Sequence, residues 1–463
     1  MAGRSRATNA APAGDVVTSS VRRALVLVIV LGALVHFVGL TSPREVVFDE
    51  VHWGQSVNAY CCNGQRQFDV HPPHGKLLIT LGAVLGGYTG DLSFERIGQP
   101  FTDQPVFFLR LVPALAGIAI PPLFLLLLRY LGASAPAALF GALMLVFDNA
   151  MLLETRLMLF DGILVAAELA TLVCMLAADR APTPGTARLQ AVLCGAFAGL
   201  SVGTKFTGLV APALVFLYIA RRVIARRTDA RAWLERSALI VAAGLAVYLG
   251  GWAVHFARTP NPGPADGFHP TTGHFFHDLW VTHTTMLSAN FSMALTHPDA
   301  SRPLTWPLMK VAPYFWAGDG ASIYLIGNPV VWWGASVLFV VFVMNSLLMM
   351  VTRLRVEAPG AARNGVWLPF VGFLLAYVPF FGITRVIFLY HYLTPLVFSI
   401  AFVVLWLDAA GWTRGDTWRG QRKSYYLTIA ALIVGFLLVS PLTYGFSVGN
   451  YDEWLAALIR SWR

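Results

Sequence analysis

Two adjacent carboxylates, Asp49 and Glu50, are the first groups in this sequence that could do chemistry. They lie in the segment 48–54, just beyond the first long apolar run of a chain in which only 12% of residues are charged. A carboxylate beside hydrocarbon is costly to keep ionised, so an acidic pair there more often marks function than decoration. A partly buried carboxylate also has a raised pKa that suits a general base. A solvated loop pair or a helix N-cap is the alternative, and the aromatic flanks Phe48 and Trp53 favour chemistry.

A second polar segment, residues 71–76, carries two histidines, two prolines, a glycine and Lys76. Proline and glycine at the start of a short helix leave backbone N–H groups that suit an anion, and the lysine adds a positive charge. An ordinary helix start with a snorkelling lysine explains the same residues equally well. His71 and His74 have no clear third ligand nearby, so the sequence predicts no metal site there.

Dense charge also occurs between two apolar runs, where Glu154 and Arg156 are followed by Asp161. Charges in such a place must be paired or must face a polar cavity. We expect Glu154 and Asp161 to support a site structurally, whereas Arg156 fits either a structural ion pair or ligand binding.

Three further cations, Arg110, Lys205 and Arg385, each lie near one end of an apolar run. The planar fork of arginine donates two parallel hydrogen bonds and therefore suits phosphate. Together with an acidic base, these cations fit a phosphorylated lipid whose head group lies at the membrane interface. For any single one of them, snorkelling to lipid head groups is the alternative.

Composition indicates a membrane protein with several spans. Hydrophobic residues make up 57% of the 463, whereas soluble domains average about 45–50%. The net charge of +9 does not indicate nucleic-acid binding, because the basic residues cluster between apolar runs and form no stripe. We therefore predict an all-α polytopic membrane protein with about eleven transmembrane helices. The predicted spans are 22–41, 106–128, 134–150, 158–178, 189–203, 206–221, 237–256, 325–351, 366–383, 386–407 and 425–446, with a short interfacial or re-entrant helix at 74–88.

The arginines predict the orientation. With the N-terminus in the cytoplasm, alternation places the arginine-rich connections of the chain on the cytoplasmic side, in agreement with the positive-inside rule. The same alternation places the long segments 42–105 and 257–324 outside, together with every unusual polar group. The sequence thus predicts a site at the outer face of the cell membrane. We expect residues 1–20 to be disordered in the cytoplasm, and residues 447–463 to form an extracytoplasmic tail.

The cysteines carry little information. Cys174 and Cys194 lie in apolar runs as small hydrophobes. Cys61 and Cys62 are adjacent in a polar loop, and the sequence gives no ground to predict a disulfide between them. The first apolar run has no cleavage site after it and is interpreted as a retained anchor.

Taken in order, the polar motifs resemble those of the protein O-mannosyltransferases, a family that attaches mannose to Ser or Thr of exported proteins. Each motif is short, but the ordered set is specific and extends through residues 22–446. The motifs are residues 48–54, 68–73, 108–110, 153–157 with Asp161, 199–206, 301–303, 327–333 and 390–393.

This resemblance implies a GT-C glycosyltransferase fold that occupies residues 21–446, with two large extracytoplasmic loops. It implies a polyprenyl-phosphate mannose donor, inversion at the sugar carbon, and secreted Ser/Thr-containing acceptor proteins. It implies no cofactor and no metal, and it leaves secretion machinery as a further candidate partner. The loop 257–324 is too short for the MIR domain of fungal and animal members, so the chain resembles the compact bacterial branch. His74 stands where many relatives have an apolar residue, which leaves its role open.

The resemblance also assigns roles to individual residues. Asp49 and Glu50 match the essential acidic pair, with Asp49 as base and Glu50 orienting the acceptor or the base. The residues expected to bind the donor phosphate or sugar are Arg110, Arg156, Lys205, Arg385 and His391. Those expected to support the site or bind the acceptor are His71, Lys76, Glu154, Asp161, Arg302 and Asn328.

Two other functions compete with this one. A GT-C transferase with a lipid or glycan acceptor would have the same fold and donor, and only the outer loops would differ. A secondary transporter would use Asp49 and Glu50 as a proton relay. Transporters place such groups near the bilayer midplane and often contain inverted repeats, and neither feature is evident here.

Overall fold

The computed structural model describes residues 16–225, 229–263, 266, 271–292, 296–352, 365–414 and 417–461. Within these ranges the regular secondary structure is helical apart from two short strand pairs. Nine of the described helices are long and apolar enough to cross a membrane, and a bent pair makes a tenth. The prediction of an all-α polytopic membrane protein is confirmed. Most of the predicted disordered segment, residues 1–15, lies outside the described ranges, and the first helix already begins at Ser19.

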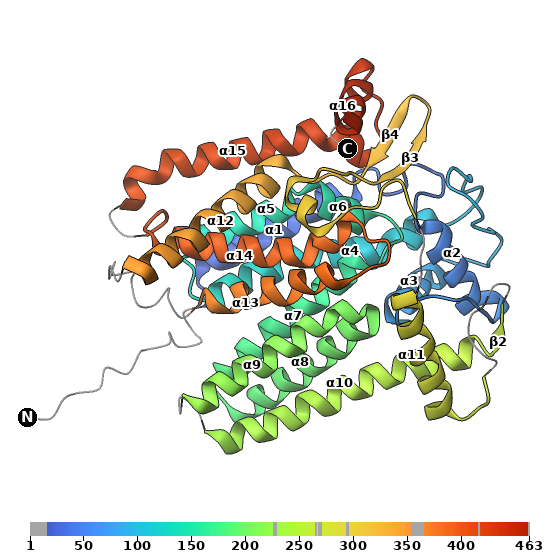
Figure 1. Cartoon of the computed structure of the whole chain (residues 1–463), viewed down its shortest axis with the longest axis horizontal. Coiled ribbons are helices and arrows are strands. Elements are labelled where there is room, and N and C mark those ends of the chain that lie inside the picture. The colour runs from blue at the N-terminus through green and yellow to red at the C-terminus, as the bar shows by residue number, and fades with distance from the viewer. Residues whose placement is uncertain are drawn as a thin grey trace, which may run out of the picture.

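The long apolar helices form the bundle seen in Figure 1. They are α1 (Ser19–Phe37), α4 (Val106–Tyr130), α7 (Asp161–Asp179), α8 (Pro184–Thr204), η3 with α9 (Phe206–Leu209 and Val210–Ile224), α10 (Ala230–Arg258), α12 (Pro329–Thr352), η7 with α14 (Leu389–Tyr392 and Leu393–Ala409) and α15 (Thr417–Tyr444). The bent pair is α5 (Ala135–Val146) and α6 (Asn149–Arg156), and the predicted span 366–383 is the shorter helix α13 (Trp367–Tyr377) continued by η6 (Val378–Gly382).

The two long connecting segments gather at one end of the bundle (Figure 1). The first contains α2 (Glu50–Asn58), the π-helix η2 (Ala59–Asn63), β1 (Gln65–Arg66) and α3 (His74–Leu85), and the second contains β2 (Asn261–Pro262), α11 (Phe275–Ser292), η4 (Pro303–Leu308), β3 (Tyr314–Gly318) and β4 (Ala321–Tyr324). Strands β1 and β2 pair in parallel and β3 and β4 in antiparallel, so the first pair joins the two segments. The predicted tail 447–463 contains a helix, α16 (Asn450–Ser461), at this same end.

The bend between α5 and α6 has an identifiable cause. The side chain of Asp148 caps α6 by accepting a hydrogen bond of 2.8 Å from the backbone N–H of Met151. Its other oxygen accepts from Trp332 Nε1 at 2.8 Å and from the Asn328 backbone at 3.2 Å. A buried carboxylate with three donors fixes the break in the chain, and the two helices meet there at 58°.

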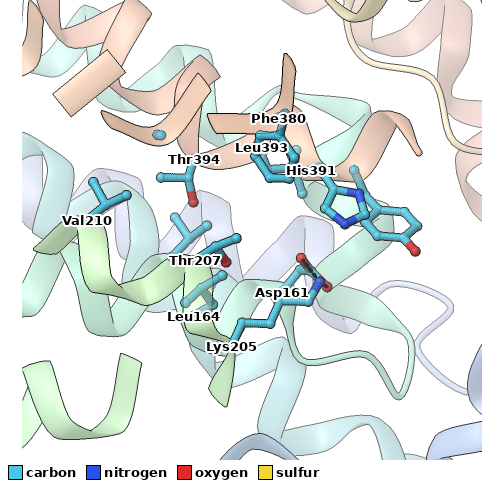
Figure 2. A pocket seen from close by; sticks show the side chains of 12 residues that line it. Asp161, Leu164, Lys205, Thr207, Val210, Phe380, His391, Leu393 and Thr394 are labelled. Atoms are coloured by element: carbon cyan, nitrogen blue, oxygen red, sulfur yellow. Dashed lines mark hydrogen bonds and ion pairs between the residues drawn. The ribbon is translucent and has the colours of Figure 1, made fainter. Parts of the chain in front are cut away.

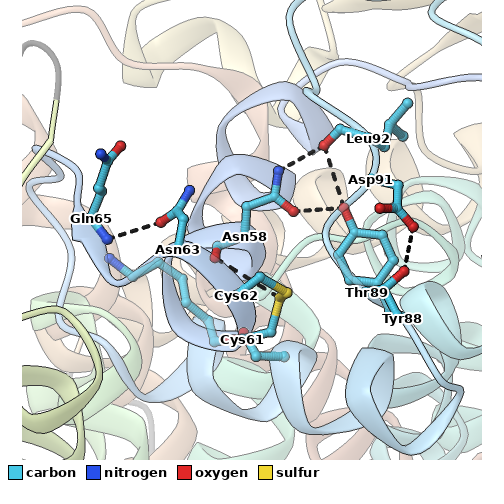
Figure 3. The surroundings of a disulfide bond; sticks show 11 residues. Asn58, Cys61, Cys62, Asn63, Gln65, Tyr88, Thr89, Asp91 and Leu92 are labelled. Carbon is cyan, nitrogen blue, oxygen red and sulfur yellow. Dashed lines mark hydrogen bonds between the residues drawn. A yellow bond between two sulfur atoms is a disulfide. The ribbon is translucent and has the colours of Figure 1, made fainter.

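A disulfide joins the adjacent residues Cys61 and Cys62 in the π-helical turn that ends α2 (Figure 3). The sequence gave no ground to predict it. The turn is held by Asn58, whose side chain donates to the carbonyl of Leu92 at 2.7 Å and accepts from the Tyr88 hydroxyl at 2.6 Å. The disulfide therefore lies where α2 gives way to the loop that leads to α3.

Glycines let α8 and α10 pack closely. A Cβ added at Gly199 would lie 2.3 Å from the backbone oxygen of Gly244, and one at Gly195 would lie 2.2 Å from that of Ile240. Small residues permit such close approach of helices in membranes. By contrast, a Cβ at Gly250, on the same helix α10, would meet nothing within 4 Å.

We predict that Gly199→Ala lowers the thermal unfolding midpoint in detergent, because the new methyl group meets backbone that cannot give way. Overpacking of this kind costs about 1–3 kcal/mol. Gly250→Ala is the matched control and should leave the midpoint unchanged or raise it slightly, since alanine favours helix over glycine. Equal midpoints for the two variants would contradict this account of the contact between α8 and α10.

Candidate active site

A buried ion pair between Glu50 and Arg110 lies beneath the site. Arg110 Nε is 2.8 Å from Glu50 Oε1, and Arg110 Nη2 is 2.9 Å from Glu50 Oε2. Neither side chain is exposed to solvent. Arg110 also donates to the carbonyls of Leu40, Pro43 and Glu45 at 3.0–3.2 Å. All the guanidinium nitrogens of Arg110 are therefore occupied by protein acceptors.

The carboxylate of Glu50 accepts two further hydrogen bonds. They come from the backbone N–H groups of Val47 and Met158, each at 2.9 Å. Glu50 thus joins the start of α2 to α4 and to the turn between α6 and α7. The predicted roles of Glu50 in catalysis and of Arg110 in phosphate binding stay predictions, and in this structure both groups are buried and engaged with each other and with the backbone.

Arg156 has a similar environment. It is buried and donates to the backbone carbonyls of Gly39, Ser42 and Thr443, and its guanidinium lies 4.7 Å from the centre of the Tyr444 ring. These contacts join α6 to the end of α1 and to α15. These contacts agree with the structural alternative for Arg156, and its predicted role in donor binding stays a prediction.

Asp49 has different surroundings from Glu50. It stands at the N-terminal end of α2, and its side chain makes no hydrogen bond with that helix. Within the described part of the chain its carboxylate forms neither an ion pair nor a side-chain hydrogen bond. It does interact electrostatically with His52, Lys205 and Asp161. Burial raises the pKa of Asp49 to about 6, against the opposing effect of His52 and Lys205.

A second carboxylate, Asp69, organises the loop between β1 and α3. It accepts from His71 Nδ1 at 2.8 Å and forms an ion pair with Lys76. Burial alone would raise the pKa of Asp69, but Lys76 and His71 outweigh it and hold the pKa well below its usual range. The ring of His71 in turn packs edge-on against Trp53 and Phe160, with centroids 5.8 and 5.3 Å away. Lys76 and His71 are therefore placed by Asp69.

Lys205 forms an ion pair with Asp161 and lies beside an aromatic ring. Its ammonium lies 2.7 and 2.8 Å from the two carboxylate oxygens of Asp161 and 5.1 Å from the centre of the Tyr390 ring. Glu154 is buried within electrostatic range of both members of this pair, and its Oε1 has no hydrogen-bond partner among the described residues. Glu154 and Asp161, which the sequence predicts to support a site, thus both lie close to Lys205.

A pocket opens beside the Asp161–Lys205 pair and extends between α7, α9, α13 and α14 (Figure 2). One end is polar, with Asp161, Lys205 and His391, and the rest is largely apolar. The apolar lining residues are Leu164, Val165, Val210, Ala376, Phe380 and Leu393. The lining thus combines a cation–carboxylate pair at one end with a largely apolar wall.

The remaining predicted site residues lie outside the pocket beside the Asp161–Lys205 pair. Arg385 is half-buried in the loop before η7 and interacts electrostatically with Tyr390 and Asp69. Arg302 is exposed at the start of η4, close to that loop, since its neighbour Ser301 donates to the carbonyl of Ile387. Asn328 is buried in a separate network and donates to the carbonyls of Phe147 and Leu432, so its predicted role becomes support of the fold.

The role of His74, which the sequence left open, is one of packing. Its ring occupies a space between two helices that only glycine permits, because a Cβ at Gly203 or Gly251 would lie 2.2–2.3 Å from ring atoms. His74 Nε2 lies 2.9 Å from the carbonyl of Val247. The histidine thereby fastens α3 to α8 and α10.

Two residues that contact His71, Lys205 or His391 were absent from the set of predicted site residues. Asp69 belongs to the motif 68–73 and is separated from His71 by one residue, a spacing at which an acidic side chain can orient an imidazole. Tyr390 precedes the predicted His391 and packs on it with centroids 4.7 Å apart. Both lay within quoted motifs, so the signal was present, but sequence alone gave no reason to prefer them over their neighbours.

Fold and site together define a polytopic membrane protein with an acidic group and several cations at one end of an apolar pocket. The sequence model of the family described as dolichyl-phosphate-mannose-protein mannosyltransferase matches residues 26–258, and that of the C-terminal four-transmembrane region of protein O-mannosyltransferase matches residues 275–462. The chain belongs to the protein O-mannosyltransferase family.

Individual relatives agree with this assignment. The chain is 32% identical over 243 residues to protein O-mannosyltransferase 1 of Drosophila melanogaster, a match that covers 50% of this chain and 27% of that protein. The chain thus spans about a quarter of that relative's length. Its fold is similar to a chain of the S. cerevisiae Pmt1–Pmt2 complex bound to the sugar donor, with a TM-score of 0.85, 17% identity, and coverage of 94% of this chain and 92% of that one. It is also similar to ArnT of Cupriavidus metallidurans bound to undecaprenyl phosphate, with a TM-score of 0.51, 17% identity, and coverage of 95% and 77%.

We predict that Glu50→Gln destabilises the protein severely, because it leaves the buried Arg110 charge without its partner. Breaking a buried ion pair costs about 3–5 kcal/mol. Glu235→Gln is the control, since Glu235 and Arg188 form an exposed pair that contributes at most about 1 kcal/mol. Thermal unfolding in detergent measures both variants. A Glu50→Gln protein that unfolds at the wild-type temperature would show that Glu50 is not the structural anchor.

Proposed function

We propose that this protein transfers mannose from polyprenyl-phosphate mannose to Ser or Thr hydroxyls of exported proteins, with inversion, at the outer face of the cell membrane. The observation that carries the proposal is the Asp49 carboxylate, which has no ion pair among the described residues and interacts electrostatically with the Asp161–Lys205 pair that lines the polar end of the pocket. An acceptor hydroxyl needs a base, a lipid phosphate needs a cation, and a prenyl chain needs an apolar channel. Family membership supplies mannose as the sugar and protein as the acceptor.

In this mechanism Asp49 accepts the proton of the acceptor hydroxyl as its oxygen attacks the anomeric carbon of mannose. The bond between that carbon and the phosphate oxygen breaks on the opposite face, and the prenyl phosphate leaves with the electron pair. Inversion follows from this single displacement. A general base in such a position contributes about 10²–10⁴-fold to a rate.

Negative charge grows on the phosphate as it leaves, and Lys205 is the group best placed to stabilise it. An ammonium has three N–H donors, and two of those on Lys205 are directed at Asp161. The third can meet a phosphate oxygen, while Asp161 keeps the ammonium in place. Arg385 adds a second positive charge near this region, since its charge acts on His391 of the pocket lining. Preorganised charge of this kind is a large contribution to catalysis.

We propose the same orientation in the membrane as the arginine pattern predicts, with the N-terminus cytoplasmic. The site end of the bundle in Figure 1 then faces outward, where exported proteins emerge. We further propose that transfer needs no metal or other cofactor, since a phosphate is already a good leaving group. Activity that survives a chelator such as EDTA would agree with this proposal, and activity restored only by added metal would contradict it.

We predict that the purified protein transfers labelled mannose from polyprenyl-phosphate mannose to a Ser/Thr/Pro-rich peptide, and that Asp49→Asn lowers the rate at least about 100-fold. Glu95→Gln, which removes an exposed carboxylate from the same long segment, is the control and should keep full activity. A wild-type protein that consumes the donor but leaves the peptide unmodified would favour a lipid or glycan acceptor. A protein that does not bind the donor at all would overturn the transferase assignment.

We predict that the transfer rate depends on pH through Asp49. The base acts only in its deprotonated form, so the rate should rise with pH, with a midpoint near the raised pKa of about 6, and should level off above it. Donor binding measured over the same range provides the control, because it does not need the base. A transfer rate that stays constant through this range would exclude Asp49 as the titrating group.

A further inference from the structure

Helix α11 carries a stripe of large apolar side chains that no part of the described chain covers. Phe276, Trp280, Leu287 and Phe291 are exposed to 74%, 70%, 56% and 70%. At about 100° per residue these positions fall within about 60° of one another around the helix, and they extend about 22 Å along it. Exposed aromatic residues on a single line are a feature of a surface that contacts something apolar.

The opposite face of α11 is packed against the bundle, which fixes the direction of the stripe. Met286 is buried with Trp252 of α10, and Leu279 packs on the same cluster. His283 Nε2 lies 2.6 Å from the Tyr248 hydroxyl. Figure 1 shows α11 crossing the end of α10 near α2 and α3, and not continuing along it.

The charges on α11 indicate which kind of partner the apolar stripe contacts. Asp278 is the only carboxylate on α11, and it is buried, accepting hydrogen bonds from Thr272 and Gly273. The polar residues beside the stripe are His277, Thr284 and Ser288, all uncharged or weakly basic. A surface with aromatic residues, a polar flank and no exposed negative charge suits the headgroup region of a membrane.

Size and position also favour lipid over a second copy of this chain. Four side chains of this kind expose on the order of 500 Å², whereas a stable protein interface buries about 800 Å² on each partner. The stripe also lies on a helix that packs against α10, a span that exposes Val241, Leu245 and Val254.

We propose that α11 lies in the membrane surface at the site end of the bundle, with Phe276, Trp280, Leu287 and Phe291 inserted among the lipid head groups. This attachment has a consequence for the site. The cluster under α11 includes Phe68 and Phe206, the neighbours of Asp69 and Lys205. A membrane-bound α11 therefore fixes the wall from which both of those charged groups project.

The test uses the full chain reconstituted in lipid nanodiscs, with a nitroxide spin label on one introduced cysteine. Trp280→Cys and Leu287→Cys report on the stripe. Phe216 of span α9 is 70% exposed, so Phe216→Cys is the lipid-facing control. Glu95→Cys is the water-facing control. Native cysteines do not interfere, because Cys61 and Cys62 form a disulfide and the other two are buried.

Collision of the label with oxygen reports lipid, and collision with a water-soluble nickel complex reports water. We expect the labels at 280 and 287 to favour oxygen, as the label at 216 does. Labels that favour nickel, as at 95, would overturn the proposal. Labels shielded from both reagents, or broadened by a second label nearby, would overturn it in favour of a protein partner. None of these results depends on mannose transfer, so failure of the proposed function would remain distinguishable.

Discussion

The Glu50–Arg110 pair connects most of the segments that build the site. Its hydrogen bonds reach the end of α1, the turn before α2, α4 itself and the turn between α6 and α7. These segments are distant in sequence, and the pair brings their polar groups to one point. Two opposite charges, fully buried, stabilise the fold only if every donor and acceptor is satisfied. The pair therefore demands a single arrangement of the surrounding backbone, and the position of Asp49 follows from it.

Adjacent residues at the start of a helix point in directions about 100° apart. This geometry separates the two carboxylates of the acidic pair. Glu50 turns inward to Arg110, whereas Asp49 lies within electrostatic range of Lys205 and Asp161. Burial raises the pKa of Asp49. The difference in direction thus gives the two neighbours different surroundings, and in the proposed mechanism it gives them different roles.

The sequence predicted the membrane class, the approximate spans and the gathering of polar groups at one end, because length and apolar content determine a span almost residue by residue. The sequence could not show which arginines are engaged by the fold itself. Arg110 and Arg156 look from sequence like phosphate ligands, but both are buried and donate to backbone carbonyls of the loop after α1. Every residue has a backbone carbonyl, so a sequence does not show which carbonyls of a loop accept hydrogen bonds from an arginine. For the same reason Asp69 and Tyr390 could not be chosen over their neighbours within motifs that were otherwise recognised.

In the proposed mechanism a lysine, and not an arginine, stabilises the leaving phosphate, and the arrangement of the cations explains why. An arginine has a rigid fork whose donors are readily shared among carbonyls, and here two arginines hold the loop backbone in place. Lysine is a compact charge with three rotatable donors, and the Lys205 ammonium can keep two on Asp161 while the third follows a moving oxygen. The phosphate oxygen changes position and gains charge as the sugar departs. A flexible point charge held by a fixed carboxylate can follow that change, whereas a guanidinium engaged by several backbone carbonyls cannot.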